Sequence, residues 1–275
     1  MITKEMTKRL LTQKKLREHV GCRYFKKHLL VIKGSHSIFY KNYYDWRKVC
    51  KEYRDVDDAV RFNDAWRWRK QKAIIRSFHN LIVAFRSYLE HIKGFVKKEH
   101  TSDEFREYIG GQLSVFENDE LTNFVVVLRD MMVHRQIYPL VSKGILKDNH
   151  KNREKDMYHF QSINREKVEE YVNSSIRDKI KKEIVTTFLQ AQPQDIDIES
   201  ILDQYFIGIN TLHREIIFGY ISAFKDALMV FSDVAAVHLK DFNDNDPINR
   251  LQLRYLQFML HNHERFCQST STDKS

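Results

Sequence analysis

Residues that form turns are scarce in this chain, which has 3 Pro and 8 Gly among 275 residues. A fold of many short strands needs a turn about every 8 to 12 residues, and those turns rely on glycine and proline. The sequence therefore predicts an all-α fold, a multi-helix bundle. A chain of this length can bury a core large enough to fold without disulfides. Its 3 Cys are scattered with no C-x-x-C pair, which argues against a disulfide framework or a cysteine-rich metal site.

Hydrophobic periodicity predicts where the helices lie. Apolar residues recur at three- and four-residue steps from about Asp57 to Lys97, as on one face of an amphipathic helix. The stretch Thr101–Glu104, TSDE, is typical of a capping box at the start of the next helix, and Gly110 with Gly111 predicts the end of that helix. Later helices are expected in three segments: 164–190, 198–239 with a bend near Gly208 or Gly219, and 248–266.

Two segments differ from this helical pattern. Residues 28–40 contain HLLVI, KGS and HSIFY, which predict either a short N-terminal β-hairpin or a helix. Residues 142–156, SKGILKDNHKNREKD, lack apolar periodicity, so we expect an exposed connection there. The expected organisation is a basic N-terminal arm, a helical core, C-terminal helices packed on that core and a disordered tail, at residues 1–56, 57–156, 157–266 and 267–275.

Basic residues are concentrated at the N-terminus. Residues 1–50 hold 13 Lys and Arg against 3 acidic residues, a net charge of +10, so the remaining residues carry −1 of the total of +9. Aromatic residues are interleaved among these charges, which is typical of a surface that attracts phosphates and stacks bases. We expect Lys14, Lys15, Lys26 and Lys27 to bind RNA. The alternative is a solvated helical arm whose aromatic side chains pack on the core.

Several familiar functions have no support in the sequence. The N-terminus has no apolar signal-peptide core, and no apolar run of about 18 residues could span a bilayer, so we expect a cytoplasmic protein without a membrane partner. Gly-rich phosphate loops, H-E-x-x-H and G-x-S-x-G do not occur, and we predict neither a cofactor nor a metal. The segment Ala65–Lys72, AWRWRKQK, either stacks on nucleic acid or buries its tryptophan rings.

Residues 123–139, NFVVVLRDMMVHRQIYP, place charges inside an apolar run. The run predicts a helix with cap candidates at Asn118 and Asp119 and a stop at Pro139. Burying a charged group costs several kcal/mol unless it is paired or the site is wet. The four ionisable residues of the run are therefore either satisfied within the fold or line a working cleft: Arg129, Asp130, His134 and Arg135.

Three pairs in the chain have the spacing R-x-x-x-x-H: Arg23 with His28, Arg86 with His91, and Arg129 with His134. Only Arg129 is followed by a small polar residue and then three apolar residues, at the end of an apolar helix. On that context residues 57–140 resemble the HEPN superfamily of all-helical domains, whose ribonuclease members carry an R-polar-x-x-x-H motif. The resemblance implies a bundle of HEPN type and an RNA-cleaving toxin or defence effector, restrained by an antitoxin or other regulatory protein.

The residue types suit RNA cleavage without a metal. That reaction needs a base for the 2′-OH, an acid for the leaving 5′-oxygen and a cation for the charged phosphate. His134 titrates near neutral pH, and Arg129 presents a planar fork of donors that matches two phosphate oxygens. Asp130 lies about one helical turn before His134 and can orient its ring. We therefore predict an endoribonuclease that leaves 2′,3′-cyclic phosphate ends, with Arg135 as a further RNA contact.

The helical spacing raises a geometric problem. Residues five apart on a straight α-helix point about 140° away from each other, so one motif forms a compact site only with a bulge or a helix end. The resemblance implies a homodimer with a composite active site, and four apolar residues would help close it: Val125, Leu128, Met131 and Met132. Two alternatives stay open. The charged residues form a satisfied internal cluster, or the chain is a non-catalytic helical RNA-binding, scaffold or partner module.

Overall fold

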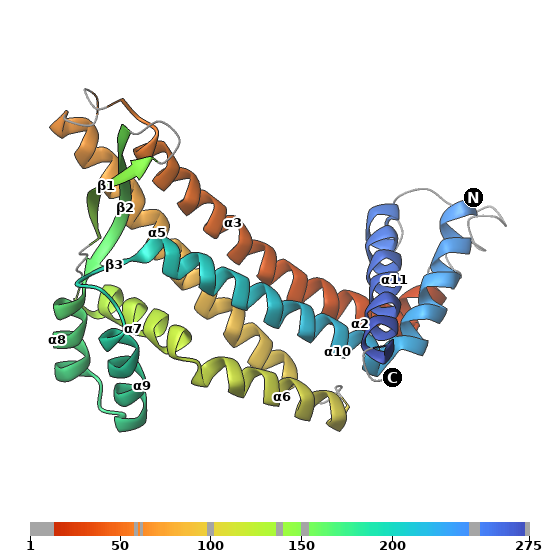
Figure 1. The fold of residues 1–275 in the computed structure, drawn as a ribbon. Coiled ribbons are helices and arrows are strands. Elements are labelled where there is room, and N and C mark those ends of the chain that lie inside the picture. The colour runs from red at the N-terminus through yellow and green to blue at the C-terminus, as the bar shows by residue number, and fades with distance from the viewer. Residues whose placement is uncertain are drawn as a thin grey trace. The chain divides into compact units, whose positions relative to one another are not determined.

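The computed structural model describes residues 14–57, 60, 63–97, 102–135, 140–149, 154–241 and 248–272. Over these residues the chain is mostly helical, which confirms the all-α prediction (Figure 1). Residues 14–18 are helical. The helices that follow are α2 (Val20–Tyr24), the π-helix η1 (Phe25–Leu29), α3 (Leu30–Arg54), α5 (Asp64–Val96), α6 (Asp103–Asn118), α7 (Glu120–Arg135), α8 (Arg165–Ser175), α9 (Lys179–Gln190), α10 (Ile198–Asp241) and α11 (Arg250–Thr272).

Short polar side chains begin several of these helices. The Asn63 Oδ1 atom accepts from the backbone N–H of Trp66 at the start of α5, and the Ser102 hydroxyl accepts from Phe105 at the start of α6. The Asp119 carboxylate accepts from Thr122, which confirms Asp119 as the cap of α7. The capping box expected at Thr101–Glu104 is thus replaced by a cap at Ser102; Thr101 lies outside the described residues.

The N-terminal β-hairpin prediction is wrong. Residues 30–40 belong to α3, and residues 25–29 form the preceding π-helix. The buried side chains follow steps of three, four and seven residues, which is the period of a helix rather than of a strand: Leu29, Ile32, Phe39, Tyr43, Trp46, Cys50 and Tyr53. This long repeat outweighs the β-like composition of HLLVI and HSIFY.

The predicted connection at residues 142–156 is also wrong, because a β-hairpin lies there. Strand β1 (Val141–Asn149) pairs antiparallel with β2 (Glu154–Asn164), with Val141 opposite Ser162 and Asn149 opposite Glu154. The short strand β3 (Asp195–Asp197) adds to the other edge of β2. Polar residues outnumber apolar ones in the two long strands, so their sequence lacks the regular apolar alternation that predicts a half-buried strand, although Phe160 and Ile163 of β2 are buried.

Several helix boundaries differ from the sequence prediction. Helix α6 continues through Gly110 and Gly111 to Asn118. The segment 164–190 is split, because Ile176 is extended and the Asp178 carboxylate caps a new helix. Helix α10 deviates from helical geometry at Phe224 rather than at Gly208 or Gly219. Helix α11 continues to Thr272, although residues from 267 onward were expected to be disordered.

The chain divides into two compact units, each built from separate stretches of sequence. Unit 1 comprises Met1–Gly34, Ile92–Gly110 and His213–Ser275, and unit 2 comprises Ser35–His91 and Gly111–Leu212. The expected segments 1–56, 57–156 and 157–266 therefore each contribute to both units. Among the described residues, no helix has the length and apolarity needed to cross a bilayer.

Each unit has its own aromatic-rich core. Unit 1 buries Phe25, Leu29, Phe95, Phe105, Ile216, Tyr220, Phe231 and Leu256. Unit 2 buries Phe39, Trp46, Phe78, Phe85, Tyr88, Phe124, Val185, Leu189 and Ile209. Within unit 2, α7 packs against α8 and α9, and α8 also contacts β2 (Figure 1). Unit 2 thus places the predicted motif of α7 on a packed scaffold.

Candidate functional site

Arg129 and Asp130 lie on the partly exposed face of α7. Phe124, Val127 and Leu128 are at most 2% exposed, and they form the side of α7 that packs into unit 2. The side chains of Arg129 and Asp130 are 35% and 28% exposed. The apolar run therefore serves the buried side of the helix, and the charges lie where solvent still reaches them.

Arg129 and Asp130 form the centre of a small charged cluster. The Arg129 guanidinium donates from Nη1 to the Asp130 carboxylate at 2.8 Å, and the Lys181 ammonium of α9 lies 3.8 Å from the same carboxylate. Two cations thus share one anion, which leaves the cluster with an excess positive charge. The Arg129 Nε–H is buried and has no acceptor among the described residues. A buried donor without an acceptor is costly, and an anion could satisfy this one only after the guanidinium turned its Nε–H toward solvent.

The structure fixes the helical position of His134 but does not describe its side chain. Helix α7 is regular from Glu120 to Arg135, so position 134 lies about one turn after Asp130 and five residues after Arg129. The side chain of Arg135 likewise lies outside the described residues. Because α7 has neither a bulge nor an end between positions 129 and 134, the two residues diverge by about 140° around the helix axis.

The apolar surface expected to close a dimer is instead part of the core. Val125, Leu128 and Met131 are 1%, 2% and 7% exposed, and Met132 is only partly exposed. Three of these four residues are therefore not free to meet a second copy. The exposed apolar residue on this helix is Val133, which is 42% exposed.

The other two arginine–histidine pairs have structural explanations. The Nδ1 atom of His28 lies 2.7 Å from the hydroxyl of Tyr220, inside the core of unit 1. The Nδ1 atom of His91 lies 2.6 Å from the hydroxyl of Ser35 in unit 2. Arg86 pairs with Glu90 at 2.7 Å along α5. His28, His91 and Arg86 are therefore accounted for by contacts within their own units.

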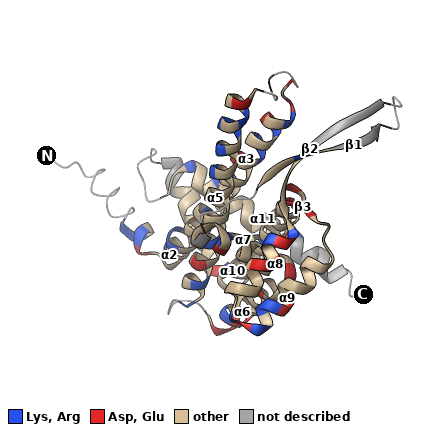
Figure 2. Cartoon of the chain, turned by 90° about the vertical axis from the view of Figure 1, so that its left-hand side faces the viewer, with Lys and Arg blue, Asp and Glu red and all other residues tan. Residues whose placement is uncertain are grey.

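The predicted RNA-binding lysines are solvated, but most of the aromatic residues near them are not. Lys14, Lys15 and Lys27 are exposed and Lys26 is partly exposed, whereas Phe25 is fully buried. Figure 2 colours Lys and Arg blue, and blue segments mark the N-terminal end of the described chain. Further along, Phe39, Tyr43 and Trp46 of α3 are core residues of unit 2. Tyr40 and Tyr44 of the same helix are 43% and 49% exposed, so the described part of the N-terminal region offers positive charge and two accessible rings, while its other aromatic side chains are at least partly buried.

Sequence reasoning missed a buried ionic network in unit 2. Glu199, at the start of α10, is 2% exposed and accepts from both Arg47 and Arg54 of α3. Its other oxygen accepts from the backbone N–H of Gln161 on β2 at 3.2 Å. Asp203, one turn further along α10, lies 3.5 Å from Arg47. No spacing in the sequence links these residues, because they come from three distant segments.

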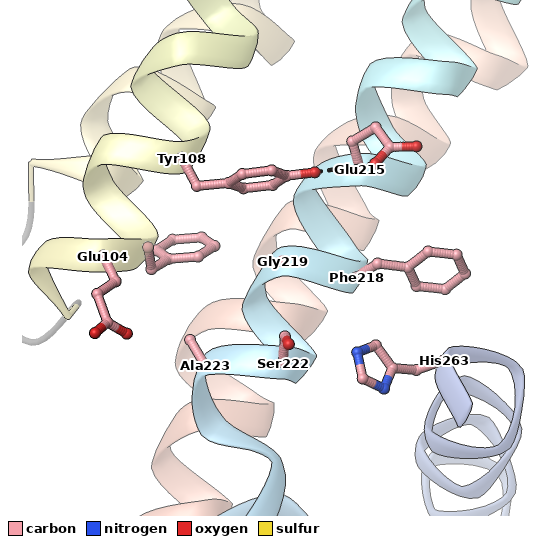
Figure 3. Close-up of a pocket in the computed structure, with 9 residues that line it drawn as sticks. Glu104, Tyr108, Glu215, Phe218, Gly219, Ser222, Ala223 and His263 are labelled. Carbon is pink, nitrogen blue, oxygen red and sulfur yellow. Dashed lines mark hydrogen bonds between the residues drawn. The ribbon is translucent and has the colours of Figure 1, made fainter. Parts of the chain in front are cut away.

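A cavity of about 370 Å³ lies in unit 1 between α6, α10 and α11 (Figure 3). The Tyr108 hydroxyl donates to the Glu215 carboxylate at 3.0 Å. The rings of Phe218 and His263 meet edge to face, with centroids 6.1 Å apart and an angle of 74° between their planes. Burial lowers the pKa of the His263 imidazole below its ordinary value of 6.5, and Lys225 lowers it further while Glu264 raises it.

A second cavity, of about 610 Å³, lies in unit 2 between the end of α3, the start of α5 and the start of β1. Its described lining includes Tyr53, Arg67, Trp68, Gln71 and Ser142. Of the two tryptophans in AWRWRKQK, Trp66 is partly buried and stacks on Tyr53, with ring centroids 5.6 Å apart. Trp68 is 62% exposed. The segment therefore combines one packed ring with one free ring.

No protein-family model, curated protein or solved structure matches this chain. The geometry of the charged cluster and the motif of α7 are therefore the grounds on which a function is proposed.

Proposed function

We propose that this chain is a metal-independent endoribonuclease that uses Arg129 and His134. In the proposed reaction the RNA 2′-oxygen attacks the adjacent phosphorus while the bond from phosphorus to the 5′-oxygen breaks. One proton leaves the 2′-OH for a base and another reaches the departing 5′-oxygen from an acid. The products are a 2′,3′-cyclic phosphate and a 5′-hydroxyl.

The observation that carries this proposal is the state of the Arg129 side chain. The Asp130 carboxylate engages Nη1, while the buried Nε–H has no acceptor among the described residues. Once the guanidinium turned toward solvent, a phosphate oxygen would satisfy that donor, and the charge that grows on the phosphoryl oxygens during the reaction would strengthen the bond. Lys181 adds a second cation at the same carboxylate. The residue types and the resemblance of the motif to HEPN ribonucleases assign the proton transfers to His134.

The regular course of α7 supports a site made from two copies of the chain. Since positions 129 and 134 diverge around one helix, His134 of one copy would act with Arg129 of the other. The face of α7 that carries Arg129, Asp130 and Val133 is the accessible one, so it is the face that a second copy would meet.

Cleavage of single-stranded RNA in excess EDTA tests the proposal. We expect the wild-type chain to cut and to leave cyclic phosphate ends. Arg129→Ala and His134→Ala are expected to be slower by about 10² to 10⁴. Arg76→Ala, at an exposed arginine of α5, is the matched control and is expected to cut normally. Cleavage that requires added divalent metal, or a fully active His134→Ala chain, would refute the mechanism.

A toxin or defence role, restrained by an antitoxin or regulatory protein, belongs to the same proposal. An active ribonuclease should slow the growth of cells that express it, and Arg129→Ala should relieve that effect. Harmless expression of a chain that also fails to cut RNA in vitro would count against both the activity and the role.

A second candidate function is a non-catalytic scaffold or RNA-binding module. It is favoured by a row of exposed apolar residues along α10: Val230, Val234 and Val237, which are 52%, 43% and 63% exposed. Most apolar residues of α10 are buried instead, including Ile209, Ile216 and Tyr220, so the helix serves mainly as core. The cleavage assay separates the two functions, because a scaffold leaves RNA intact.

A further inference from the structure

Trp68 is an unusual residue to find exposed on a folded chain. Indole rings are large and apolar, and they are highly buried on average. Trp68 is nevertheless 62% exposed at the rim of the 610 Å³ cavity of unit 2. The ammonium of Lys72 lies 4.6 Å from the centroid of the ring, which is a cation–π contact on the same helix. The ring is therefore oriented by a neighbour but remains accessible.

Positive charge surrounds this ring. Residues 67–72 read RWRKQK, with four basic residues in six. Arg67 also lines the cavity and pairs with Asp64 at 2.6 Å, but the two side chains are 54% and 86% exposed. An ion pair as exposed as this contributes little stability, so a phosphate can replace Asp64 as the partner of Arg67 at small cost.

The inner wall of the cavity is polar and internally satisfied. The Gln71 amide donates to the Leu140 carbonyl and accepts from the Ser142 hydroxyl. Ser142 also bonds to the side chain of Gln161, whose backbone N–H donates to the buried Glu199. This wall is therefore held in place, and both polar ends of the Gln71 amide are already engaged. Recognition here would depend on the flat ring and the charges more than on hydrogen bonds to base edges.

We infer that this cavity binds one base of single-stranded RNA. The base stacks on Trp68, and its flanking phosphates contact Arg67 and Lys72. An aromatic face beside a basic helix is the combination that binds single strands with little sequence preference. The inference rests on the proposed function only in naming RNA as the ligand. If both hold, the cavity is a substrate-binding subsite of the ribonuclease, in the same unit as Arg129. It also places a stacking ring in unit 2, beyond the exposed Tyr40 and Tyr44 of the N-terminal region.

Binding of a fluorescein-labelled 2′-O-methyl oligouridine to the full chain tests the inference. This probe lacks the nucleophilic 2′-OH, so binding is measured without cleavage. We expect Trp68→Ala to weaken binding by roughly tenfold or more and Trp68→Phe, which keeps an aromatic face, to lose much less. Phe258→Ala is the matched control, because Phe258 is 64% exposed in unit 1, and it should bind like the wild type.

Three results would overturn the inference. Trp68→Ala could bind the probe as tightly as the wild type. Phe258→Ala could weaken binding as much as Trp68→Ala, which would indicate nonspecific adhesion to exposed rings. Uridine monophosphate could compete as strongly as the oligomer, which would identify a free-nucleotide site instead. If Trp68→Ala weakens binding but the wild-type chain does not cut RNA, only the proposed function is refuted. If the wild-type chain cuts RNA but Trp68→Ala binds the probe normally, only the subsite is refuted.

Discussion

Glu199 shows how a single buried carboxylate joins distant parts of unit 2. It is 2% exposed and connects α3, β2 and the start of α10 through Arg47, Arg54 and the backbone of Gln161. Removing the Glu199 carboxylate would take this anion from Arg54 and leave Arg47 with Asp203, while both guanidiniums stay partly buried. The pair between Glu52 and Lys70 in the same unit is different, because the Glu52 side chain is 43% exposed and water can replace its partner.

Glu199→Gln is therefore expected to lower the free energy of unfolding by about 3 kcal/mol or more. The variant keeps the shape of the side chain but leaves Arg47 and Arg54 without their shared anion. Urea denaturation measures the change, and Glu52→Gln is the matched control, with an expected loss below about 1 kcal/mol. Similar losses of unfolding free energy in the two variants would mean that the buried ion pairs of Glu199 stabilise the chain no more than the exposed pair of Glu52.

His263 predicts a pH dependence of stability. Burial holds the pKa of this imidazole below 6.5 in the folded chain, so the unfolded chain takes up the proton first as the pH falls. The stability contributed by the neutral imidazole is thus complete above about pH 6.5 and is lost as the pH falls below that value. We expect the drop in Tm between about pH 7.5 and pH 5 to be smaller in His263→Gln than in the wild type. His261→Gln, at an exposed histidine of the same helix, is the control. Equal drops in all three chains would contradict this account.

At the scale of elements, a long apolar repeat and a helix cap were predictable, whereas strand-like composition and a pair of glycines were misleading. The repeat from Ile74 to Ile92 correctly indicated α5, and Asp119 correctly indicated the start of α7. The β-like stretch at residues 28–40 misled because its apolar residues belong to a longer helical repeat that continues to Tyr53. The hairpin at 141–164 was missed because its two strands are mostly polar. Their sequence has no regular alternation of apolar and polar residues from which strands could be predicted.

Alanine substitutions at Gly110 of α6 and Gly21 of α2 are expected to change stability in opposite directions. A Cβ added at Gly110 would meet nothing within 4 Å, and the helix continues past it. Gly110→Ala should therefore stabilise the chain by about 0.5 to 1 kcal/mol. Gly21→Ala should destabilise it by about 1 to 3 kcal/mol, because a Cβ there would collide with the Ala227 carbonyl and lie 2.5 Å from the Phe231 Cβ. Thermal unfolding checks both signs. Destabilisation by Gly110→Ala would mean that the helix ends at the glycine pair.

The candidate site was predictable only in part. Sequence context selected Arg129 and Asp130, and the structure places them on the accessible face of α7. Lys181 joins them from α9, about fifty residues away in the chain, so only the packing of α7 on α9 brings it there. The predicted dimer surface failed because Val125, Leu128 and Met131 look equally apolar in the sequence whether they face a partner or the core.

At the scale of the whole molecule, the charge distribution predicts how RNA affinity depends on salt. The net charge of +10 in residues 1–50 exceeds that of the entire chain. We expect neutralisation of Lys14, Lys15, Lys26 and Lys27 to reduce the slope of log affinity against log salt by up to about 3, since each single-strand phosphate contact contributes roughly 0.7.

The same fourfold variant should cut RNA normally at saturating substrate, because these lysines would hold the substrate and the transition state alike. Binding measured over a salt titration, together with single-turnover cleavage, separates the two effects. An unchanged salt slope would show that the N-terminal charge serves only to keep the chain soluble.

The composite ribonuclease site is the central claim, and mixing two inactive variants tests it most directly. Arg129→Ala and His134→Ala chains are refolded together so that mixed dimers form, and cleavage of RNA in EDTA is compared with that of each variant alone. In a mixed dimer one site pairs the intact His134 of one copy with the intact Arg129 of the other. We predict that the mixture recovers roughly a quarter of the wild-type activity, since about half of the dimers are mixed and each has one complete site. A mixture that stays as inactive as its separate components would contradict the claim.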